Sequence, residues 1–247
     1  MKVSDRFSRS FPFDDGLPSI YEENGKMGVK MSNGVKVIPP IYNTIKELDM
    51  LTAQYMVEFK GKYGVLEIDP NGEVSTKLEI EYDLFKYVKD VECYLIGKND
   101  KFGIWHNDLH LPCECNKIQL LNNNDLLICK NGKYGVWDWH ICVPCDYDEI
   151  TLVEYEKECG VGELKWTGRD EYYLLKQGDK YGLWSIDTQL LPTIYDEIAP
   201  PIDEWGIKVK KNDVWGYLDK EHNFTTDLSK VPLKWEDLSD VGRGISF

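Results

Sequence analysis

The sequence lacks any apolar run near the ~20 residues that a helix needs to cross a bilayer. Its first residues, MKVSDRFSRSFPF, also lack the apolar middle section of a secretion signal. No phosphate-binding glycine loop, GxSxG elbow or HExxH motif occurs. These absences predict a cytoplasmic protein that is not an enzyme, with no catalytic residue and no bound cofactor.

Basic residues are scarce beside acidic ones, with 29 Lys and Arg against 43 Asp and Glu and a formal net charge of −14. Because like charges repel, nucleic acids and anionic membrane surfaces are disfavoured as direct partners. A basic protein is the expected partner. The seven Cys are an odd number in a chain without a secretion signal, which predicts reduced thiols rather than a disulfide framework.

Hydrophobic residues make up 42% of the chain and aromatic residues 13%, which is typical of a globular protein. A short phrase recurs along the chain, for example as KGKYGVL, NGKYGVW and GDKYGLW. The separations between its glycines, 36, 39, 32, 47 and 34 residues, lie in the range of repeat architectures. The six copies are anchored at Gly28, Gly64, Gly103, Gly135, Gly182 and Gly216.

A second phrase follows the glycine at a similar offset, as in VIPPIYNTI, CVPCDYDEI and LLPTIYDEI, and it ends more weakly in the last copy as KVPLKWEDL. Two phrases in one order make coincidence improbable. The sequence therefore predicts one repeat domain over residues 1–240, followed by a short tail over 241–247.

Short alternating segments run into turn pairs, which predicts hairpins because Asn, Asp and Gly tolerate positive φ. The turn pairs are Lys60-Gly61, Asn99-Asp100, Asn131-Gly132, Gly178-Asp179 and Asn212-Asp213. In the glycine strand, large side chains point to one face, and the other face carries a large side chain beside the glycine, which leaves room for one more. We therefore expect this strand to be buried, with an aromatic side chain over the glycine. The following proline is expected at a strand edge, and the segment from Tyr155 to Asp170 is expected to be irregular.

These phrases resemble the WG-repeat (KWG-type) family, whose unit has Lys, an aromatic and Gly in succession and a downstream P-x-YD-x-I phrase. Five copies place Tyr, Phe or Met before the glycine instead of Trp. The resemblance implies a bacterial β-rich interaction module and brings no catalytic residue. We predict an all-β fold of tandem short antiparallel strands, and favour a propeller-like closed ring slightly over an open hairpin solenoid.

A cluster of thiols and imidazoles offers zinc ligands from neighbouring repeats. However, Cys113 and Cys145 follow the repeat proline, where other copies carry Pro40 and Thr193, and buried Cys often serves as a small hydrophobic residue. We therefore predict no metal site. The residues that such a site would use are His106, His110, Cys113, Cys115, Cys142 and Cys145.

Paired acids in the YDEI phrases, such as Asp148 with Glu149 and Asp196 with Glu197, invite an acid–base interpretation. Their recurrence in register instead favours a structural role, in which the acid accepts backbone N–H bonds in a turn.

The Trp residues of the glycine strands, Trp105, Trp137, Trp184 and Trp215, are expected in the core. Of those outside this register, which include Trp139, the better candidates for an exposed partner anchor are Trp166 and Trp205.

The leading functional hypothesis is a non-enzymatic protein-binding module with an acidic surface, for example an immunity protein that neutralises a basic toxin. The alternative is a small-molecule or glycan binder, or a hydrolase, that uses a central cavity of a repeat ring. That alternative requires convergent polar side chains from several copies. The spacing of the aligned residues does not distinguish such a site from ordinary turns; they are Asp69, Asp138, Ser185, Asp187 and Asp219.

Overall fold

The computed structural model has an all-β fold, which confirms the predicted tandem short antiparallel strands. The described strands form six small antiparallel sheets, one of three strands and five of four. The chain divides into two compact units, Met1–Glu114 and Cys115–Phe247, and the prediction of a single repeat domain stays a prediction. The residues described are 16–49, 52–161, 164–185, 188–199, 207–218, 223–227 and 229.

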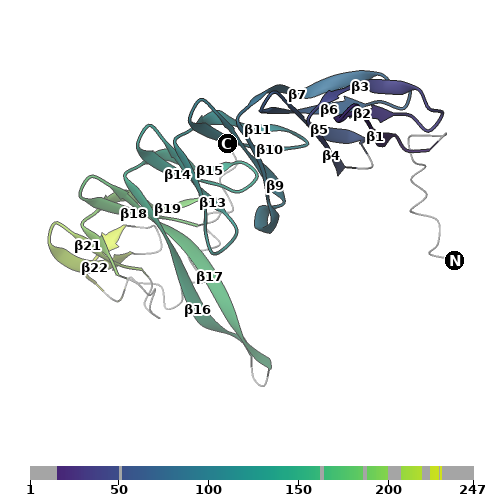
Figure 1. The fold of residues 1–247 in the computed structure, drawn as a ribbon. Helices are drawn as coiled ribbons and strands as arrows, with labels where there is room; N and C mark the ends of the chain where they lie inside the picture. Colours follow the sequence, from purple (N-terminus) through teal and green to yellow (C-terminus); the bar gives the residue numbers. More distant parts are fainter. Residues whose placement is uncertain are drawn as a thin grey trace. The chain divides into compact units, whose positions relative to one another are not determined.

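The first unit contains three sheets in chain order (Figure 1). The first sheet consists of β1 (Ser19–Glu23), β2 (Lys26–Lys30) and β3 (Lys36–Tyr42). The second consists of β4 (Thr44–Asp49), β5 (Gln54–Phe59), β6 (Lys62–Ile68) and β7 (Val74–Tyr82). The third consists of β8 (Leu84–Val88), β9 (Cys93–Lys98), β10 (Lys101–His106) and β11 (Asp108–Cys115), with a 3-10 turn (Lys89–Val91) after β8.

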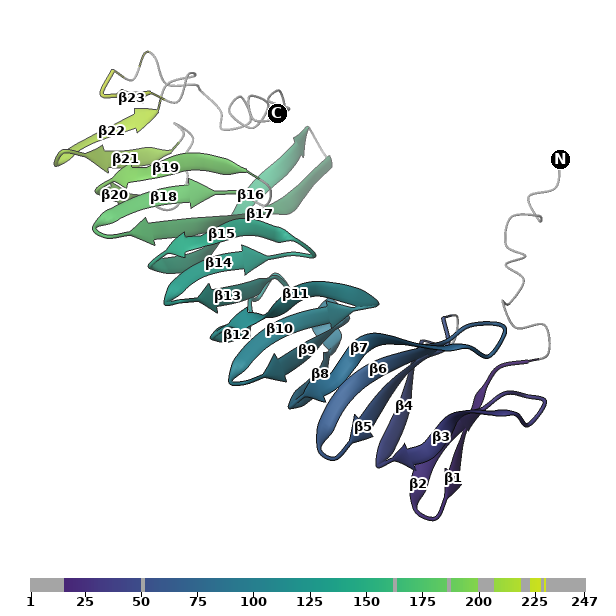
Figure 2. The same ribbon diagram turned by 90° about the horizontal axis from the view of Figure 1, so that it is seen from above.

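The second unit begins with the sheet of β12 (Lys117–Leu120), β13 (Leu126–Lys130), β14 (Lys133–Trp137) and β15 (Ile141–Tyr147). Next come β16 (Glu149–Val161), β17 (Leu164–Gln177), β18 (Lys180–Trp184) and β19 (Gln189–Tyr195). The last described sheet has β20 (Glu197–Ile198), β21 (Lys208–Lys211), β22 (Val214–Leu218) and β23 (Phe224–Thr225). In every sheet each strand pairs with the next one along the chain (Figure 2).

Two-residue turns lead into the glycine strands, as the sequence predicts. β5 and β6 are joined by Lys60 and Gly61, whose φ angles are 53° and 78°. β13 and β14 are joined by Asn131 and Gly132, at 53° and 79°. Two positive φ angles match the twist of the flanking strands, so these hairpins form locally.

The glycine and the residue after it are buried in β2, β6, β10, β14 and β18, as expected, whereas β22 exposes Val214 and Trp215. In four of these strands the glycine faces a bulge in the strand that follows. Tyr134 pairs with Tyr147 and Val136 with Val143, so Gly135 lies opposite three residues of β15. The same shift occurs between β2 and β3, β6 and β7, and β18 and β19. The prolines lie in these bulges on an outer strand, where no ladder N–H is required, which confirms their expected position.

The atom closest to the glycine is a carbonyl oxygen of the bulged strand. A Cβ at Gly135 would lie 2.6 Å from the Val143 oxygen, and one at Gly64 would lie 2.7 Å from the Leu78 oxygen. An aromatic ring approaches as closely only at Gly28 and Gly216 among these six glycines, from Tyr21 and Phe224. The expectation of an aromatic over every glycine was therefore wrong at the other four, because the bulge fills that space with backbone.

The hydrophobic core lies between consecutive sheets. In the first unit one cluster joins Val29 and Ile38 of the first sheet to Tyr55 and Val57 of the second. In the second unit another joins Val143 of the fourth sheet to Leu175 of the fifth. Each sheet thus buries its faces against the sheets before and after it in its unit, which is the packing expected of stacked repeats.

One Asx residue carries the chain from one sheet to the next. Asp148 separates β15 from β16, and its backbone N–H donates to the Lys176 oxygen at 2.8 Å as the first rung of the new sheet. The N–H groups of Asn43, Asp83, Asn116 and Asp196 make the equivalent bonds. The preceding Tyr147 is buried in one sheet and Ile150 is buried in the next, so the YDEI phrase is the junction between sheets.

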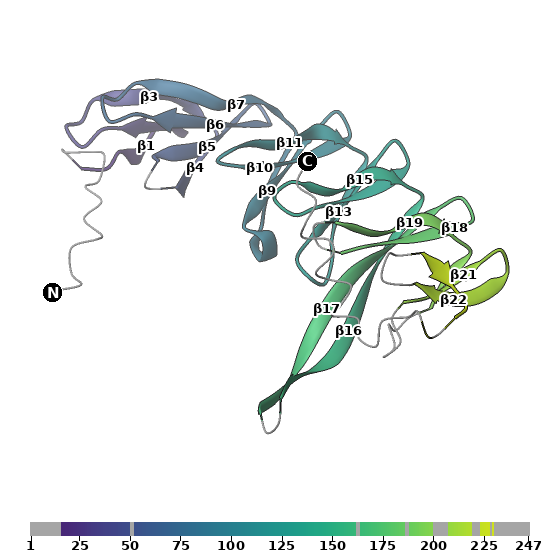
Figure 3. The ribbon, with the colours of Figure 1, turned by 180° about the vertical axis from the view of Figure 1, so that it is seen from behind.

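The segment between Tyr155 and Asp170 is regular, contrary to the expectation of an irregular insert. Its backbone continues the ladder of β16 and β17, from Tyr155 opposite Asp170 to Val161 opposite Leu164. β18 pairs only with Tyr173 to Gln177 of β17, so this two-stranded arm extends beyond its own sheet (Figures 1 and 3). The pairing of two strands satisfies the backbone groups that an irregular loop would leave to water.

Among the described residues, no helix reaches the length and apolar character that a membrane span requires.

We expect Gly135→Ala to lower the free energy of unfolding by about 2–4 kcal/mol, because the new methyl group collides with backbone and with the Cys145 sulfur, 2.8 Å from its position. Gly132→Asn is the control, since Asn adopts positive φ and the Cβ position at Gly132 has nothing within 4 Å. Urea unfolding measures both variants. Equal stability of the two variants would contradict the proposed constraint.

Candidate interaction surface

The side chain of the junction Asx binds a lysine in a strand of one sheet and a backbone N–H in a turn of the next sheet. In the second unit, Asp148 accepts a bond from the Lys133 ammonium at 2.6 Å through one oxygen and from the Gly178 N–H at 2.7 Å through the other. Asp196 is bound in the same way by Lys180 and by the Asp213 N–H. These contacts hold the pKa of both carboxyls below the ordinary value. The structural interpretation is therefore confirmed for the two aspartates of the YDEI phrases, and it stays a prediction for Glu149 and Glu197.

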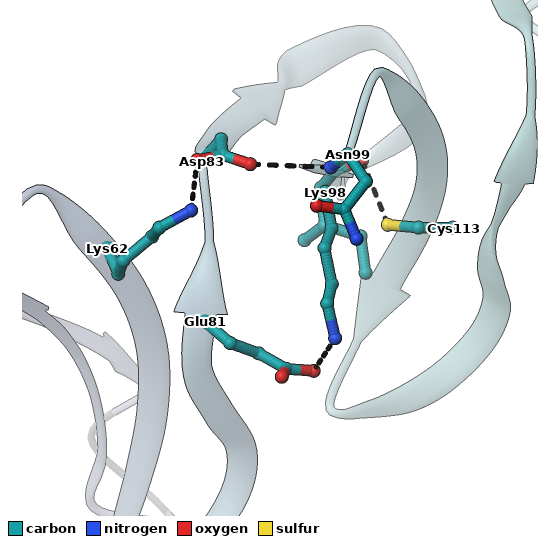
Figure 4. A network of polar contacts seen from close by, with 7 residues as sticks. Lys62, Glu81, Asp83, Lys98, Asn99 and Cys113 are labelled. Carbon is teal, nitrogen blue, oxygen red and sulfur yellow. Dashed lines mark hydrogen bonds and ion pairs between the residues drawn. The ribbon is translucent and has the colours of Figure 1, made fainter.

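The same network occurs in the first unit (Figure 4). Lys62 and the Asn99 N–H bind the carboxylate of Asp83, and the Lys98 ammonium lies 2.5 Å from Glu81. Sequence analysis did not pair the repeat lysine with the junction Asx. The available signal was that both residue types recur at fixed positions in the same copies.

We expect Asp148→Ala to lower the melting temperature by a few degrees, and Asp148→Asn to lower it less. The Asn variant keeps an acceptor for the Gly178 N–H, as Asn116 does for the Asn131 N–H at 2.9 Å. The pKa of Asp148 is lower in the folded chain than in the unfolded chain. Its contribution to stability is therefore present when the pH is above the pKa of the unfolded chain, and it is lost as the pH falls through the pKa of the folded chain. Thermal unfolding should show the difference in melting temperature between wild type and Ala shrinking as the pH falls below the ordinary aspartate pKa of 3.8, and a pH-independent difference would contradict the ion pair.

The Cys and His candidates do not assemble into a metal site in the described part of the chain, where no group of three or more His, Cys, Asp or Glu is placed to hold an ion. The Cys113 thiol donates to the Ile96 oxygen at 3.6 Å, and the Cys142 thiol donates to the Val136 oxygen at 3.4 Å. Burial raises the pKa of Cys142 to about 11 and also raises the pKa of Cys113 and Cys145. These protonated thiols pack as small hydrophobic groups.

The remaining candidates of this group are placed as follows. Cys115 is buried, and Nδ1 of His106 lies 2.9 Å from the Glu92 oxygen. The side chain of His110 lies outside the described residues.

The Trp residues divide between core and surface. Trp105 and Trp137 are buried and Trp184 is half-buried, as predicted, whereas Trp215 is 38% exposed, so its assignment to the core was wrong. Trp215 precedes its glycine instead of following it by two residues, which changes the face of the strand on which it lies.

The side chains of the two Trp residues proposed as partner anchors lie outside the described part of the chain. The backbone of Trp166 pairs with Cys159 in the β16–β17 arm, and its side chain lies outside the described residues. Trp205 lies outside the described residues altogether.

Sequence analysis missed an exposed Trp in the turn between β14 and β15. Trp139 is 46% exposed, and its ring centroid lies 5.7 Å from that of buried Trp137. Ile141, which pairs with Trp137 across the strands, is 51% exposed. An aromatic and an aliphatic side chain therefore meet solvent together at this end of the β12–β15 sheet.

A group of carboxyls lies at the same end of the sheet. Leu126 pairs with Trp137, so Asp125 and Asp138 continue the two strands opposite each other. The Asp125 carboxylate accepts bonds from the Tyr173 hydroxyl and, at 2.9 Å, from the Asn123 amide. Because Tyr173 belongs to the next sheet, these bonds hold Asp125 at the contact of two sheets.

The Asp125 carboxyl is in an unfavourable place for a negative charge. Burial and then the charge of Asp138 raise its pKa to about 6, with a smaller rise from Glu171, and the Asn123 hydrogen bond opposes the shift. We call Asp125, Asp138 and Glu171 the acidic group. Their carboxyls lie on the side of the sheet that packs on the next sheet, and their charges repel one another.

Comparison with known proteins gives no assignment: no protein-family model matches the chain, and no curated protein matches it.

We expect Asp125→Asn to raise the free energy of unfolding at pH 7 by about 1 kcal/mol, a figure reduced for solvent screening of a half-buried group. The pKa of Asp125 is about 6 in the folded chain and near 4 in the unfolded chain. The protonated carboxyl therefore stabilises the fold below about pH 4, and this stabilisation is lost as the pH rises through about 6. Urea unfolding from pH 4 to pH 7 should therefore show the wild type losing stability relative to the variant. A constant difference across this range would contradict the assigned environment, which includes Tyr173, Asn123, Asp138, Glu171 and Cys142.

Proposed function

We propose that the protein is a non-enzymatic binding protein whose acidic surface docks a basic protein. The observation that supports this proposal is the pairing of the repeat lysines with the junction carboxylates. Lys62, Lys133 and Lys180 each bind the junction carboxylate of a repeat, so these cations neutralise acids of the scaffold itself. The excess of acidic residues, 43 against 29 basic ones, is therefore left for surfaces outside the junctions.

The repeated sheets support a binding role in a second way. Each sheet adds similar turns and strand edges to its unit, and stacked repeats offer extended surfaces for protein partners. Complementary charge speeds the encounter of two proteins and selects against partners of the same sign. A basic protein fits both properties.

One concrete form of the proposal is an immunity protein that neutralises a basic toxin in the bacterial cytoplasm, such as a nuclease with a basic active-site cleft. Membership of the WG-repeat family belongs to the same proposal and rests on the Lys-aromatic-Gly and YDEI phrases.

Closure of the six sheets into a propeller-like ring is also part of the proposal. Consecutive sheets pack face to face within each unit, as a ring and an open solenoid both require. Small-angle X-ray scattering separates the two forms, because a ring has a smaller maximum dimension than an open row of the same sheets.

We expect affinity capture with the tagged protein, from cells that produce it, to retain a basic protein in stoichiometric amount at low salt and to release it at high salt. Intact-mass analysis identifies the partner and its sequence gives its charge. The same tag on an unrelated protein of similar net charge is the control. An acidic partner, or one whose retention does not depend on salt, would refute the electrostatic docking.

A further inference from the structure

The arm formed by β16 and β17 has the longest open strand edge among the described sheets. β16 has thirteen residues, and among the described strands its only neighbour is β17. Its register runs without a shift from Glu149 opposite Lys176 to Val161 opposite Leu164. Figure 3 shows the arm extending beyond the two other strands of its sheet, so the backbone groups along the outer side of β16 are accessible to another chain.

The other outer strands are protected against pairing with another chain. The first strands of the other five sheets have only two to six residues. At the opposite edge, β3, β7, β15 and β19 are interrupted by bulges, and three of these four strands contain proline. Short strands, bulges and prolines are common means by which proteins prevent edge-to-edge association. β16 has neither a proline nor a register shift, so its edge is the exception.

The register shows which residues of β16 direct their backbone groups outward. Gln177 and Lys180 close a two-residue hairpin turn, so the backbone groups of Gln177 and of every second residue before it point to the side of β18. The residues of β17 between them bond to β16. In this register Glu154, Glu156 and Glu158 direct their N–H and C=O groups to the open edge.

The outward residues also give this edge a negative charge. Glu154, Glu156 and Glu158 occupy alternate positions and therefore share one face of the arm. Of the three, only Glu156 has a basic residue, Arg169, directly opposite in β17. Cross-strand pairs of opposite charge stabilise a sheet, and pairs of like charge destabilise it. An added strand is therefore favoured when it carries basic residues at alternate positions.

The same charges distinguish this occupant from the alternatives. Two copies of β16 paired antiparallel around Glu156 would place glutamates opposite glutamates, which disfavours a second copy of the chain. The open edge of β17 is a poorer site for a basic segment. Its residues 164–172 include two basic and two acidic residues, whereas β16 has four acidic residues and one basic residue.

We propose that the open edge of β16 binds an extended segment of the basic partner protein, which adds to the arm as a new strand. This inference rests on the proposed function and names its contact. The backbone of the segment pairs with the outward N–H and C=O groups of Glu154, Glu156 and Glu158, and its Lys or Arg residues lie beside these glutamates. In strand addition, main-chain hydrogen bonds give affinity and alternate side chains give specificity.

The test uses a fluorescent, capped seven-residue peptide, Thr-Lys-Val-Lys-Val-Lys-Thr, whose binding to the full chain is measured by anisotropy at low salt. We expect this peptide to bind and a matched peptide with Glu in place of Lys not to bind. A third peptide keeps the lysines but is N-methylated at its five inner residues. It should bind at least about tenfold more weakly, because it has lost the N–H donors that strand addition requires.

Two proline variants locate the edge. Glu156→Pro removes an outward N–H and should weaken peptide binding by about tenfold, whereas Glu156→Gln removes only the charge and should weaken it by about threefold. Thr167→Pro is the matched control, because it removes an outward N–H from the other edge of the same arm, and it should leave binding unchanged. Neither proline takes an N–H from the β16–β17 ladder, so both variants should keep the melting temperature of the wild type within a few degrees.

Other outcomes overturn the inference. No binding by wild type, or equal binding by wild type and Glu156→Pro, would refute the β16 edge as the site. Equal weakening by the two prolines would show that the contact is not specific to this edge, and tight binding of the N-methylated peptide would refute strand addition.

The proposed function is tested separately by the salt-sensitive capture of a basic protein. Capture that is as strong with Glu156→Pro as with wild type would support that function and refute the β16 edge. Peptide binding at this edge without any captured basic protein would refute the function and leave the edge as a strand acceptor.

Discussion

The backbone N–H of one Asx residue starts each new sheet, and the stacking of the repeats depends on this junction. The preceding residue is buried in the sheet that ends, as Tyr147 is, and an apolar residue two positions after the Asx is buried or half-buried in the sheet that begins, as Ile150 is buried. Within each unit, a connection of one residue leaves the next sheet little freedom except to pack against the previous one. The Asx carboxylate then ties a lysine of one sheet to a turn of the next, as Asp148 ties Lys133 to Gly178.

A second constraint acts inside each sheet. The bulge opposite Gly135 presses a carbonyl oxygen toward the place where a side chain would be, and the same arrangement recurs at Gly64. In three of the four described bulges, all but the one opposite Gly64, the bulge also accommodates a proline, which has no N–H to donate to a ladder. The first recurring phrase of the sequence thus forms the glycine strand, and the second forms the bulged strand that pairs with it.

These devices also influence the charge of the surface. The lysines that precede the glycines are engaged at the junctions, whereas the carboxyls of the acidic group repel one another. The turn between β14 and β15 departs from the related turns at one residue, because Trp139 stands where they have Gly34, Gly72 or Asn107. A repeat scaffold tolerates such a change in one turn, since each sheet packs only on its neighbours.

The sequence alone determined the repeat, the hairpin turns, the buried glycine strands and the structural role of Asp148 and Asp196, because these features depend on local backbone preferences that recur in register. It could not reveal that a carbonyl, rather than an aromatic ring, covers most of the glycines, because the bulge is a property of strand pairing. Nor could it reveal that the segment after Tyr155 pairs with itself as an arm.

Tertiary structure also decided which Trp residues are exposed, since Trp137 and Trp139 lie only two residues apart, yet Trp137 is buried at the end of β14 and Trp139 is exposed in the turn that follows. The raised pKa of Asp125 likewise comes first from burial and then from the charge of Asp138, with a smaller contribution from Glu171 of the next sheet, so it depends on how two sheets stack.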